Sequence, residues 1–222
     1  MTTGYQLPVT SYSTPVSPTW CPGCGNFMVL AALKSAFVGL GLPPHQIVVA
    51  HDIGCSGNMA DFLKTYGLHT LHGRVVPVAI GVKLSNPTLT VCCFGGDGGL
   101  YGEGLSHLIA AARSDFDINV FVANNQLYSL TTGQASPTTP KGIPTKSTPF
   151  GTPSLAVDAI KLIKSVNPQV FAKSINSGNI NQLKTAIVDA LKHPGFSLLQ
   201  IDQFCLAFGK QISSTPTSAG RK

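Results

Sequence analysis

The sequence predicts an α/β fold built as one domain, with a mostly parallel sheet flanked by helices. Short apolar segments rich in β-formers alternate with longer segments whose apolar residues recur at helical spacing, as in βαβ units. The chain has 222 residues, which suits one large domain rather than two. Polar and glycine residues follow the apolar runs Leu89–Phe94 and Ile118–Ala123. We therefore expect a ligand site at the carboxyl ends of the strands.

The expected domain covers residues 20–210. Residues 1–19 are rich in Pro, Ser and Thr and lack a periodic pattern, which predicts an extended arm that becomes ordered against a partner. Residues 211–222 are expected to form a flexible tail.

The first half of the chain predicts helices and one buried strand. Leu30, Leu33 and Ala36 fall on one face of a helix that Gly39 and Gly41 end. The expected elements are a helix over Phe27–Gly39, a strand over Ile47–Ala50, a short helix over Met59–Tyr66 and a helix from the His72-Gly73-Arg74 turn to about Leu84.

The second half predicts strands over Leu89–Phe94 and Ile118–Ala123, joined by a helix that begins near Leu100. Residues Gln134–Pro153 are rich in Pro, Thr and Gly, and so long an irregular loop is usually functional. The remaining expected elements are a helix capped by Ser154 and ending at Val166, a strand over Val170–Lys173, a helix over Ile180–Lys192 and a strand over Phe196–Ile201.

The segment GGDGG at residues 95–99 suits a hard cation bound to a diphosphate. Its glycines allow a sharp turn and close approach to a ligand. The Asp97 carboxylate, the Asn125 amide oxygen and the Leu127 carbonyl would supply oxygen ligands for Mg²⁺, and a helix N-terminus favours phosphate. The alternative is a glycine-rich turn in which Asp97 only caps a helix.

Two of the six cysteines, Cys92 and Cys93, lie inside an expected strand, where neighbouring side chains point to opposite faces. We interpret them as unreactive core residues. The other cysteines lie in expected loops: Cys21, Cys24, Cys55 and Cys205. Four loop thiolates can bind one tetrahedral metal ion or a [4Fe–4S] cluster, and the spacing alone favours zinc or no shared site.

Composition excludes several classes of protein. Charged residues make up 11% of the chain, the mean hydropathy is +0.22, and no apolar run is long enough to predict a membrane span. We expect a cytoplasmic protein, since the N-terminus lacks a secretory pattern, with part of its surface buried against other subunits. The net charge of +6 is scattered, which argues against nucleic-acid binding, although a basic face would suit an acidic electron carrier.

A family resemblance adds to these predictions. Asp97 followed by Asn125 resembles the thiamine diphosphate motif, and the continuation NQLYSLTTGQASPTT at residues 125–139 is similar to the β subunit of 2-oxoacid:ferredoxin oxidoreductases. The resemblance extends from Trp20 to about Lys210. It implies a thiamine diphosphate-binding α/β domain that, with a partner α subunit and further subunits, converts a 2-oxoacid and coenzyme A to acyl-CoA and CO₂. Electrons would pass through a [4Fe–4S] cluster to ferredoxin.

The resemblance also implies functions for particular residues. The expected cofactor-binding set is Ile53, Gly54, Cys55, Ser56, His72, Gly96, Asp97, Gly98, Gly99, Asn125, Leu127, Ser129 and Leu130. Among these, Asp97, Asn125 and Leu127 would hold Mg²⁺. His72 is a candidate catalytic residue, with an ordinary loop histidine as the alternative. The glutamate that activates the cofactor would come from the partner α subunit, since Glu103 is not well placed.

For the cluster, the implied ligands are Cys21 and Cys24 in WCPGCG, Cys55 in IGCS, and Cys205, whose sequence context is the least specific. Two positions depart from the family pattern. Gly99 stands where many similar sequences have a second acid, and Thr132 stands where some have a lysine that contacts the substrate carboxylate. The choice of 2-oxoacid is therefore open.

Two alternatives remain. A cluster-free thiamine diphosphate-dependent decarboxylase would keep Asp97 and Asn125 but would leave the loop cysteines unexplained. A zinc-stapled, non-catalytic interaction subunit would use the cysteines but would not bind a magnesium-dependent ligand.

Overall fold

A six-stranded sheet forms the centre of the computed structural model, which describes residues 7–213. Every strand is parallel to its neighbours, in the order β2-β1-β3-β4-β8-β7. The strands are β1 Ile47–His51, β2 Tyr66–His69, β3 Thr90–Gly96, β4 Asn119–Asn124, β7 Phe171–Asn176 and β8 Ser197–Asp202. The predicted parallel α/β sheet is therefore confirmed.

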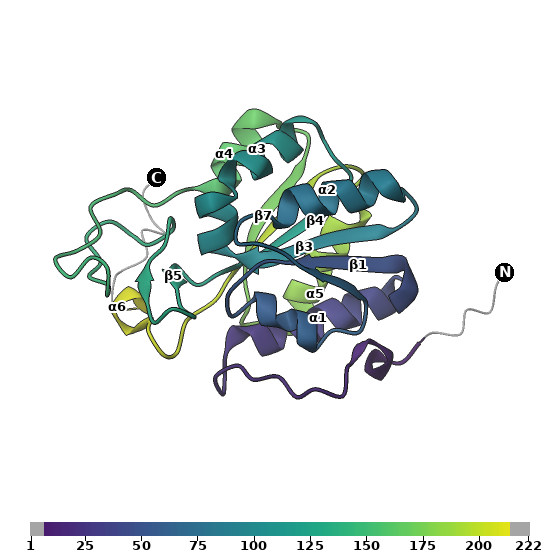
Figure 1. Cartoon of the computed structure of the whole chain (residues 1–222), viewed down its shortest axis with the longest axis horizontal. Helices are drawn as coiled ribbons and strands as arrows, with labels where there is room; N and C mark the ends of the chain where they lie inside the picture. The colour runs from purple at the N-terminus through teal and green to yellow at the C-terminus, as the bar shows by residue number, and fades with distance from the viewer. Residues whose placement is uncertain (1–6, 214–222) are drawn as a thin grey trace.

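Helices cover both faces of this sheet (Figure 1). One face packs against α1 Gly25–Gly39 and α5 Ile180–Lys192, and the other against α2 Val75–Ser85, α3 Leu105–Arg113 and α4 Ala159–Val166. Because both faces are covered, β1 and β4 are buried along their whole length. Cys92 packs in the core on the α1 side and Cys93 in the core on the α2 side, as the strand geometry predicts.

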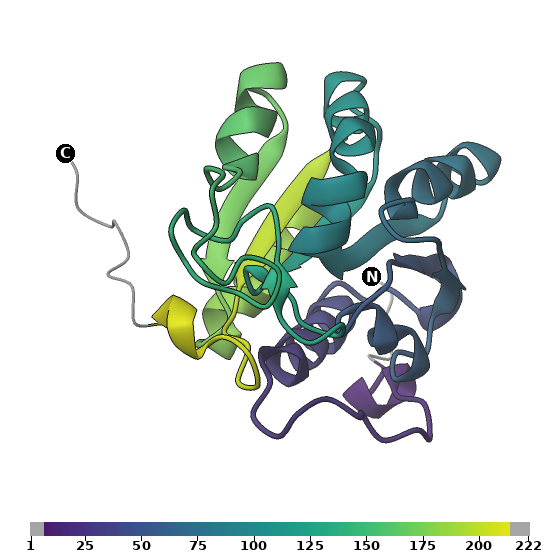
Figure 2. The ribbon, with the colours of Figure 1, turned by 60° about the vertical axis from the view of Figure 1, so that its left-hand side comes forward.

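The strand order reverses direction between β1 and β3. From β1 the chain continues to β2 at one edge, whereas from β3 it continues to β4 on the other side. Loops from the two strands diverge at such a point and leave a crevice at the carboxyl ends of the strands. The short hairpin of β5 Leu127–Tyr128 and β6 Gln134–Ala135 and the loop that follows lie at this end of the sheet (Figure 2).

The predicted helix over Met59–Tyr66 is wrong. The structure has a 3₁₀ helix over Gly57–Asp61 and then the edge strand β2, which pairs with β1. All four residues of β2 are exposed, so the strand lacks the alternation of buried and exposed residues that identifies strands from sequence.

The start predicted for α4 is also wrong. The helix begins at Ala159, and its N-cap is Asp158, whose carboxylate accepts the Lys161 N–H at 3.0 Å. Ser154 lies in an irregular segment that instead bonds to the long loop through Val157 N–H and Pro137 O, 2.8 Å apart.

The expected N-terminal arm packs on its own domain where it is described. A 3₁₀ helix covers Val9–Tyr12, and Tyr12 is fully buried beside Phe37, with its hydroxyl donating to Leu42 O at 2.5 Å. At the other end of the chain, α6 covers Lys210–Ser213. Residues 1–6 and 214–222, and the predictions made for them, lie outside the described residues. Within the described residues, no helix has the length and apolar character needed to cross a membrane.

Candidate functional site

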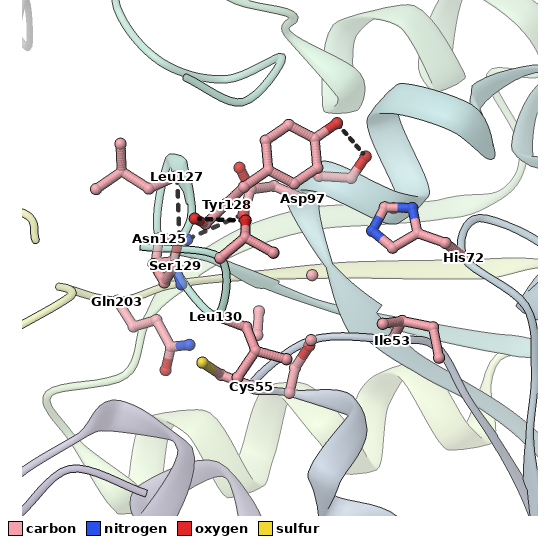
Figure 3. A pocket seen from close by; sticks show the side chains of 17 residues that line it. Ile53, Cys55, His72, Asp97, Asn125, Leu127, Tyr128, Ser129, Leu130 and Gln203 are labelled. Atoms are coloured by element: carbon pink, nitrogen blue, oxygen red, sulfur yellow. Dashed lines mark hydrogen bonds between the residues drawn. The ribbon is translucent and has the colours of Figure 1, made fainter. Parts of the chain in front are cut away.

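A cavity opens where the strand order reverses, at the carboxyl ends of β1, β3, β4 and β8 (Figure 3). The structure brings together around it every residue expected to bind the cofactor: Ile53, Gly54, Cys55, Ser56, His72, Gly96, Asp97, Gly98, Gly99, Asn125, Leu127, Ser129 and Leu130. These residues come from loops far apart in the sequence. Their binding to a cofactor stays a prediction.

Asp97 provides a carboxylate at the floor of this cavity. Its side chain is 1% exposed, and burial raises the pKa of its carboxyl group, while hydrogen bonds from Ser136 and Thr138 oppose that shift. The Ser136 and Thr138 hydroxyls lie 2.5 and 2.6 Å from Oδ2. These short distances are typical of a hydroxyl bonded to an ionised carboxylate. The contact between Oδ1 and the Asn125 N–H is longer, at 3.4 Å, so Oδ1 is the oxygen better placed to bind a cation.

Asn125 and Leu127 lie next to Asp97 because the chain turns sharply after β4. Gln126 has a φ of +62°, in the left-handed region, and the Asn125 Oδ1 accepts the Leu127 N–H at 3.0 Å. The Thr139 hydroxyl holds the same turn by donating to Gln126 O at 2.6 Å. Asp97, Asn125 and Leu127 thus line one cavity, and a carboxylate, an amide oxygen and a main-chain carbonyl are the kinds of ligand that Mg²⁺ prefers.

His72 forms the wall of the cavity opposite this turn. Its Nδ1 lies 3.0 Å from Glu103 Oε2, and the Arg74 guanidinium donates to Glu103 O at 2.8 Å. Glu103 is the single glutamate of the sequence and is engaged by His72 at the end of the π-helix Gly99–Glu103. That the activating glutamate comes from a partner subunit stays a prediction.

Four residues that line the cavity were not predicted from the sequence: Ala123, Tyr128, Thr131 and Gln203. Tyr128 lies across the cavity from His72, with ring centroids 6.0 Å apart, and its hydroxyl donates to Gly98 O at 3.3 Å. Burial raises the pKa of Tyr128 to about 12, with smaller contributions from Glu103 and Asp97. The ring also explains Gly98, because a β-carbon there would lie 2.4 Å from the ring. The match at residues 125–139 contained the signal for Tyr128.

Two polar atoms at the cavity lack partners among the described residues. The Ser129 Oγ and Gln203 Oε1 are buried and accept or donate no hydrogen bond. Buried polar atoms of this kind are costly unless a ligand or water completes them. Their position at the cavity wall fits a site built to hold a polar ligand.

A second cavity adjoins the first and shares Cys55, Asn125, Ser129, Leu130 and Gln203 with it. All of the loop cysteines expected to bind a cluster line it: Cys21, Cys24, Cys55 and Cys205. The Trp20 indole fixes this wall by donating to Cys55 O at 2.6 Å.

All of these thiols are free of disulfide bonds, and two of them lie where burial disfavours the thiolate form. Burial raises the pKa of Cys55 to about 11, with smaller contributions from the neighbouring cysteines, and burial also raises the pKa of Cys24. Among the described residues, no three His, Cys, Asp or Glu side chains converge on a single metal ion. A four-iron cluster binds each thiolate through a different iron, so it requires cysteines around a shared volume.

Thr132, the candidate substrate contact, has a φ of +80° and is not among the residues that line the cofactor cavity; it lines a separate hollow with Gly133 and Lys146. It is exposed, and the Lys146 ammonium from the long loop donates to its hydroxyl. A cation thus reaches position 132 although the residue there is neutral.

The sequence of this chain is similar to a known protein family and to known proteins. Residues 45–201 match the family model of the thiamine pyrophosphate enzyme, C-terminal TPP binding domain. The chain is 40% identical over 200 residues to 2-oxoacid:ferredoxin oxidoreductase 1, subunit beta, of Aeropyrum pernix, covering 90% of this chain and 63% of that protein. It is 38% identical over 193 residues to the 2-oxoglutarate synthase subunit KorB of Archaeoglobus fulgidus, covering 86% of this chain and 72% of the relative.

A solved structure agrees with these matches. The 2-oxoglutarate:ferredoxin oxidoreductase from Magnetococcus marinus, with 2-oxoglutarate, coenzyme A and succinyl-CoA bound, superposes with a TM-score of 0.90 at 31% identity. The match covers 94% of this chain and 72% of that one. The chain spans 61–63% of the length of the first three curated relatives it matches.

Proposed function

The chain belongs to the 2-oxoacid:ferredoxin oxidoreductase β subunits within the thiamine pyrophosphate enzymes, and from this membership we propose that it is the cofactor-binding half of such an enzyme. The complete enzyme would oxidise a 2-oxoacid with coenzyme A to acyl-CoA and CO₂, and would pass the electrons to ferredoxin. The observation that carries this proposal is the pair of adjoining cavities, one lined by Asp97 and Asn125 and the other by four cysteines.

The first cavity fits thiamine diphosphate and Mg²⁺. When bound, thiamine diphosphate would supply the carbanion chemistry that a 2-oxoacid decarboxylation needs, and the residues of this cavity would hold and orient it. Asp97, Asn125 and the Leu127 carbonyl would hold Mg²⁺ against the diphosphate, and the unpartnered Ser129 hydroxyl is available to a polar group of the cofactor. A divalent cation would also offset the burial that disfavours the charged form of Asp97.

The second cavity fits a [4Fe–4S] cluster bound by Cys21, Cys24, Cys55 and Cys205. Cluster iron would stabilise the thiolate form that burial disfavours at Cys55. Because Cys55 lines both cavities, the two groups would lie side by side, as electron transfer from one to the other requires. Ferredoxin is the proposed acceptor, and the basic net charge of +6 suits an acidic protein of this kind.

The proposal requires an α subunit. Thiamine diphosphate needs an acid to activate its aminopyrimidine ring, and Glu103 is bound to His72 at the wall of the cavity. A glutamate from the partner would complete the site. His72 is the candidate of this chain for proton transfer, because the Glu103 carboxylate orients its ring. We propose a cytoplasmic enzyme of this heteromeric type.

For the substrate we propose a 2-oxoacid whose carboxylate is bound near Thr132. The Lys146 ammonium lies at that position and would take the place of the lysine that some related sequences have at 132.

The proposal is tested by anaerobic purification of the chain with its α subunit, followed by metal analysis and visible spectroscopy. We expect about four irons and four sulfides per chain and an absorption band that bleaches when 2-oxoacid and coenzyme A are added together. A colourless protein containing zinc would support a structural function for the cysteines. A metal-free protein that binds thiamine diphosphate with Mg²⁺ would support a cluster-free decarboxylase, and Asp97→Ala should abolish that binding.

A further inference from the structure

We propose that Asp52 is a positioning residue of the cofactor cavity: its carboxylate holds the His72-Gly73 turn and occupies the space of a side chain at position 99. The inference rests on the proposed function, because it concerns the site assigned to thiamine diphosphate. Asp52 does not itself line the cavity, but it contacts the backbone of two segments that do.

The position of Asp52 follows from the sheet. It comes directly after β1, and its N–H donates to Phe94 O at 2.9 Å, which extends the pairing of β1 with β3 by one residue. The side chain is therefore directed into the space between these two strand ends. It is completely buried there.

One carboxylate oxygen of Asp52 fixes the wall that carries His72. The Oδ1 accepts the Gly73 N–H at 2.9 Å, and Gly73 has a φ of +68°. A β-carbon on Gly73 would lie 2.7 Å from Glu103, so the turn is also packed closely against the partner of His72. The bond from Asp52 thus restrains the direction in which His72 enters the cavity.

The other oxygen lies where a side chain at position 99 would begin. A β-carbon on Gly99 would be 1.8 Å from Asp52 Oδ2 and 2.9 Å from Cγ. No residue larger than glycine fits at 99 while Asp52 keeps this conformation. An acid at position 99, on the turn that follows β3, would place its side chain in the same volume. The carboxylate of this site therefore comes from the end of β1.

Filling the space beside Gly99 does not by itself explain why a carboxylate stands at position 52. Its Oδ2 has no hydrogen-bond partner among the described residues, and a buried carboxylate oxygen without a donor is costly. An apolar side chain would fill the space without that cost. The charged groups that face the carboxylate are those of the His72 wall, His72 and Glu103, which points to a function in orienting that wall.

The consequence is measurable as cofactor affinity. If the carboxylate selects the conformation of the turn that accepts the cofactor, its loss lowers the fraction of molecules competent to bind. The apparent dissociation constant then rises by the inverse of that fraction. Stability alone would not report this change.

The test compares five variants of the full chain, each purified in complex with its α subunit: Asp52→Asn, Asp52→Gly, Gly99→Asp, the double variant Asp52→Gly/Gly99→Asp, and Asp115→Asn. Thiamine diphosphate is titrated at saturating Mg²⁺, followed by circular dichroism, and thermal unfolding is measured alongside. Asp115 is the matched control, since its carboxylate accepts a backbone N–H, that of Phe196, at the same 2.9 Å. Asp115 and Phe196 are absent from the residues that line the cavity.

We expect Asp52→Gly to raise the apparent dissociation constant at least about tenfold, and Asp52→Asn to raise it by several-fold, since the amide keeps an oxygen for Gly73 but not the charge. Gly99→Asp alone should lower the melting temperature sharply, because both side chains need one volume. The double variant should bind within about threefold of the wild type. Asp115→Asn should lower the melting temperature and leave affinity unchanged.

Tight binding by both single Asp52 variants would overturn the inference while leaving the proposed function intact. So would a double variant that binds no better than Asp52→Gly. A wild-type complex that failed to bind thiamine diphosphate at all would overturn the proposed function itself, and this inference with it.

Discussion

Replacing Thr138 with valine should show how strongly the long loop is held by the Asp97 carboxylate. Thr138 is 4% exposed, and its hydroxyl lies 2.6 Å from Asp97 Oδ2 and 2.9 Å from Asn124 Oδ1. Valine has nearly the same shape but leaves the carboxylate with one donor fewer. Hydrogen bonds to charged groups contribute about 1.5–3 kcal/mol. We therefore expect the free energy of unfolding to fall by about 2 kcal/mol, and the melting temperature of a chain of this size to fall by roughly 4–8 °C.

The assay is urea unfolding at pH 8 without ligands. Thr145→Val is the matched control, since Thr145 lies in the same loop, is 7% exposed and has its Oγ1 2.8 Å from the neutral hydroxyl of Thr148. Thr145→Val should lower the free energy of unfolding by about 1 kcal/mol. Thr138→Ser should cost less than Thr138→Val because it keeps the hydroxyl. Equal losses for the two valine variants would refute the reasoning, because they would show that the Thr138 hydroxyl gives Asp97 no charge-assisted bond.

Three further predictions concern other parts of the site. Burial lowers the pKa of His51 to about 3 from its ordinary 6.5, so the unfolded chain binds a proton that the folded chain excludes. Stability should therefore fall by about 2 kcal/mol from pH 7 to pH 5, and urea unfolding of His51→Gln should show a shallower pH dependence; equal slopes would contradict it. In the assembled enzyme, Lys146→Met should raise the KM for the 2-oxoacid about tenfold without changing the KM for coenzyme A, since one charge-assisted bond is lost; an unchanged KM would remove Lys146 from the substrate site. Cys205→Ala should lower iron content after anaerobic purification whereas Cys92→Ala should not, and full iron in Cys205→Ala would exclude it as a ligand.

The sheet could be predicted because its strands are buried and short. β1, β3 and β4 are read as continuous apolar runs since helices cover both faces, and polar residues mark the ends of each run. β2 has no such signal. Its residues are all exposed, and pairing with β1 alone makes it a strand. Pairing between segments distant in sequence is invisible to a local pattern.

Sequence motifs predicted most of the residues that line the candidate cavity, but they did not predict the hydrogen bonds that hold those residues in place. The residues expected to bind the cofactor surround one cavity because each follows a parallel strand or lies in the turn beside it. Ser136 and Thr138 were included in a matching segment without an assigned function. Their contact with Asp97 depends on a loop that folds back over β3, and the sequence predicted only that this loop is functional.

The glycine at position 99 shows why a sequence motif does not describe every contact within a site. From the sequence alone, a glycine at position 99 predicts that the site lacks a second carboxylate. The motif covers only β3 and the turn that follows it, so it takes no account of side chains from other strands. The site depends on where atoms lie, and neighbouring parallel strands are only about 4.8 Å apart. Asp52, after β1, therefore reaches the volume beside Gly99, after β3. The departure at position 99 and the burial of an acid at position 52 are one feature of the structure, since no side chain fits at position 99 while the Asp52 carboxylate occupies that volume.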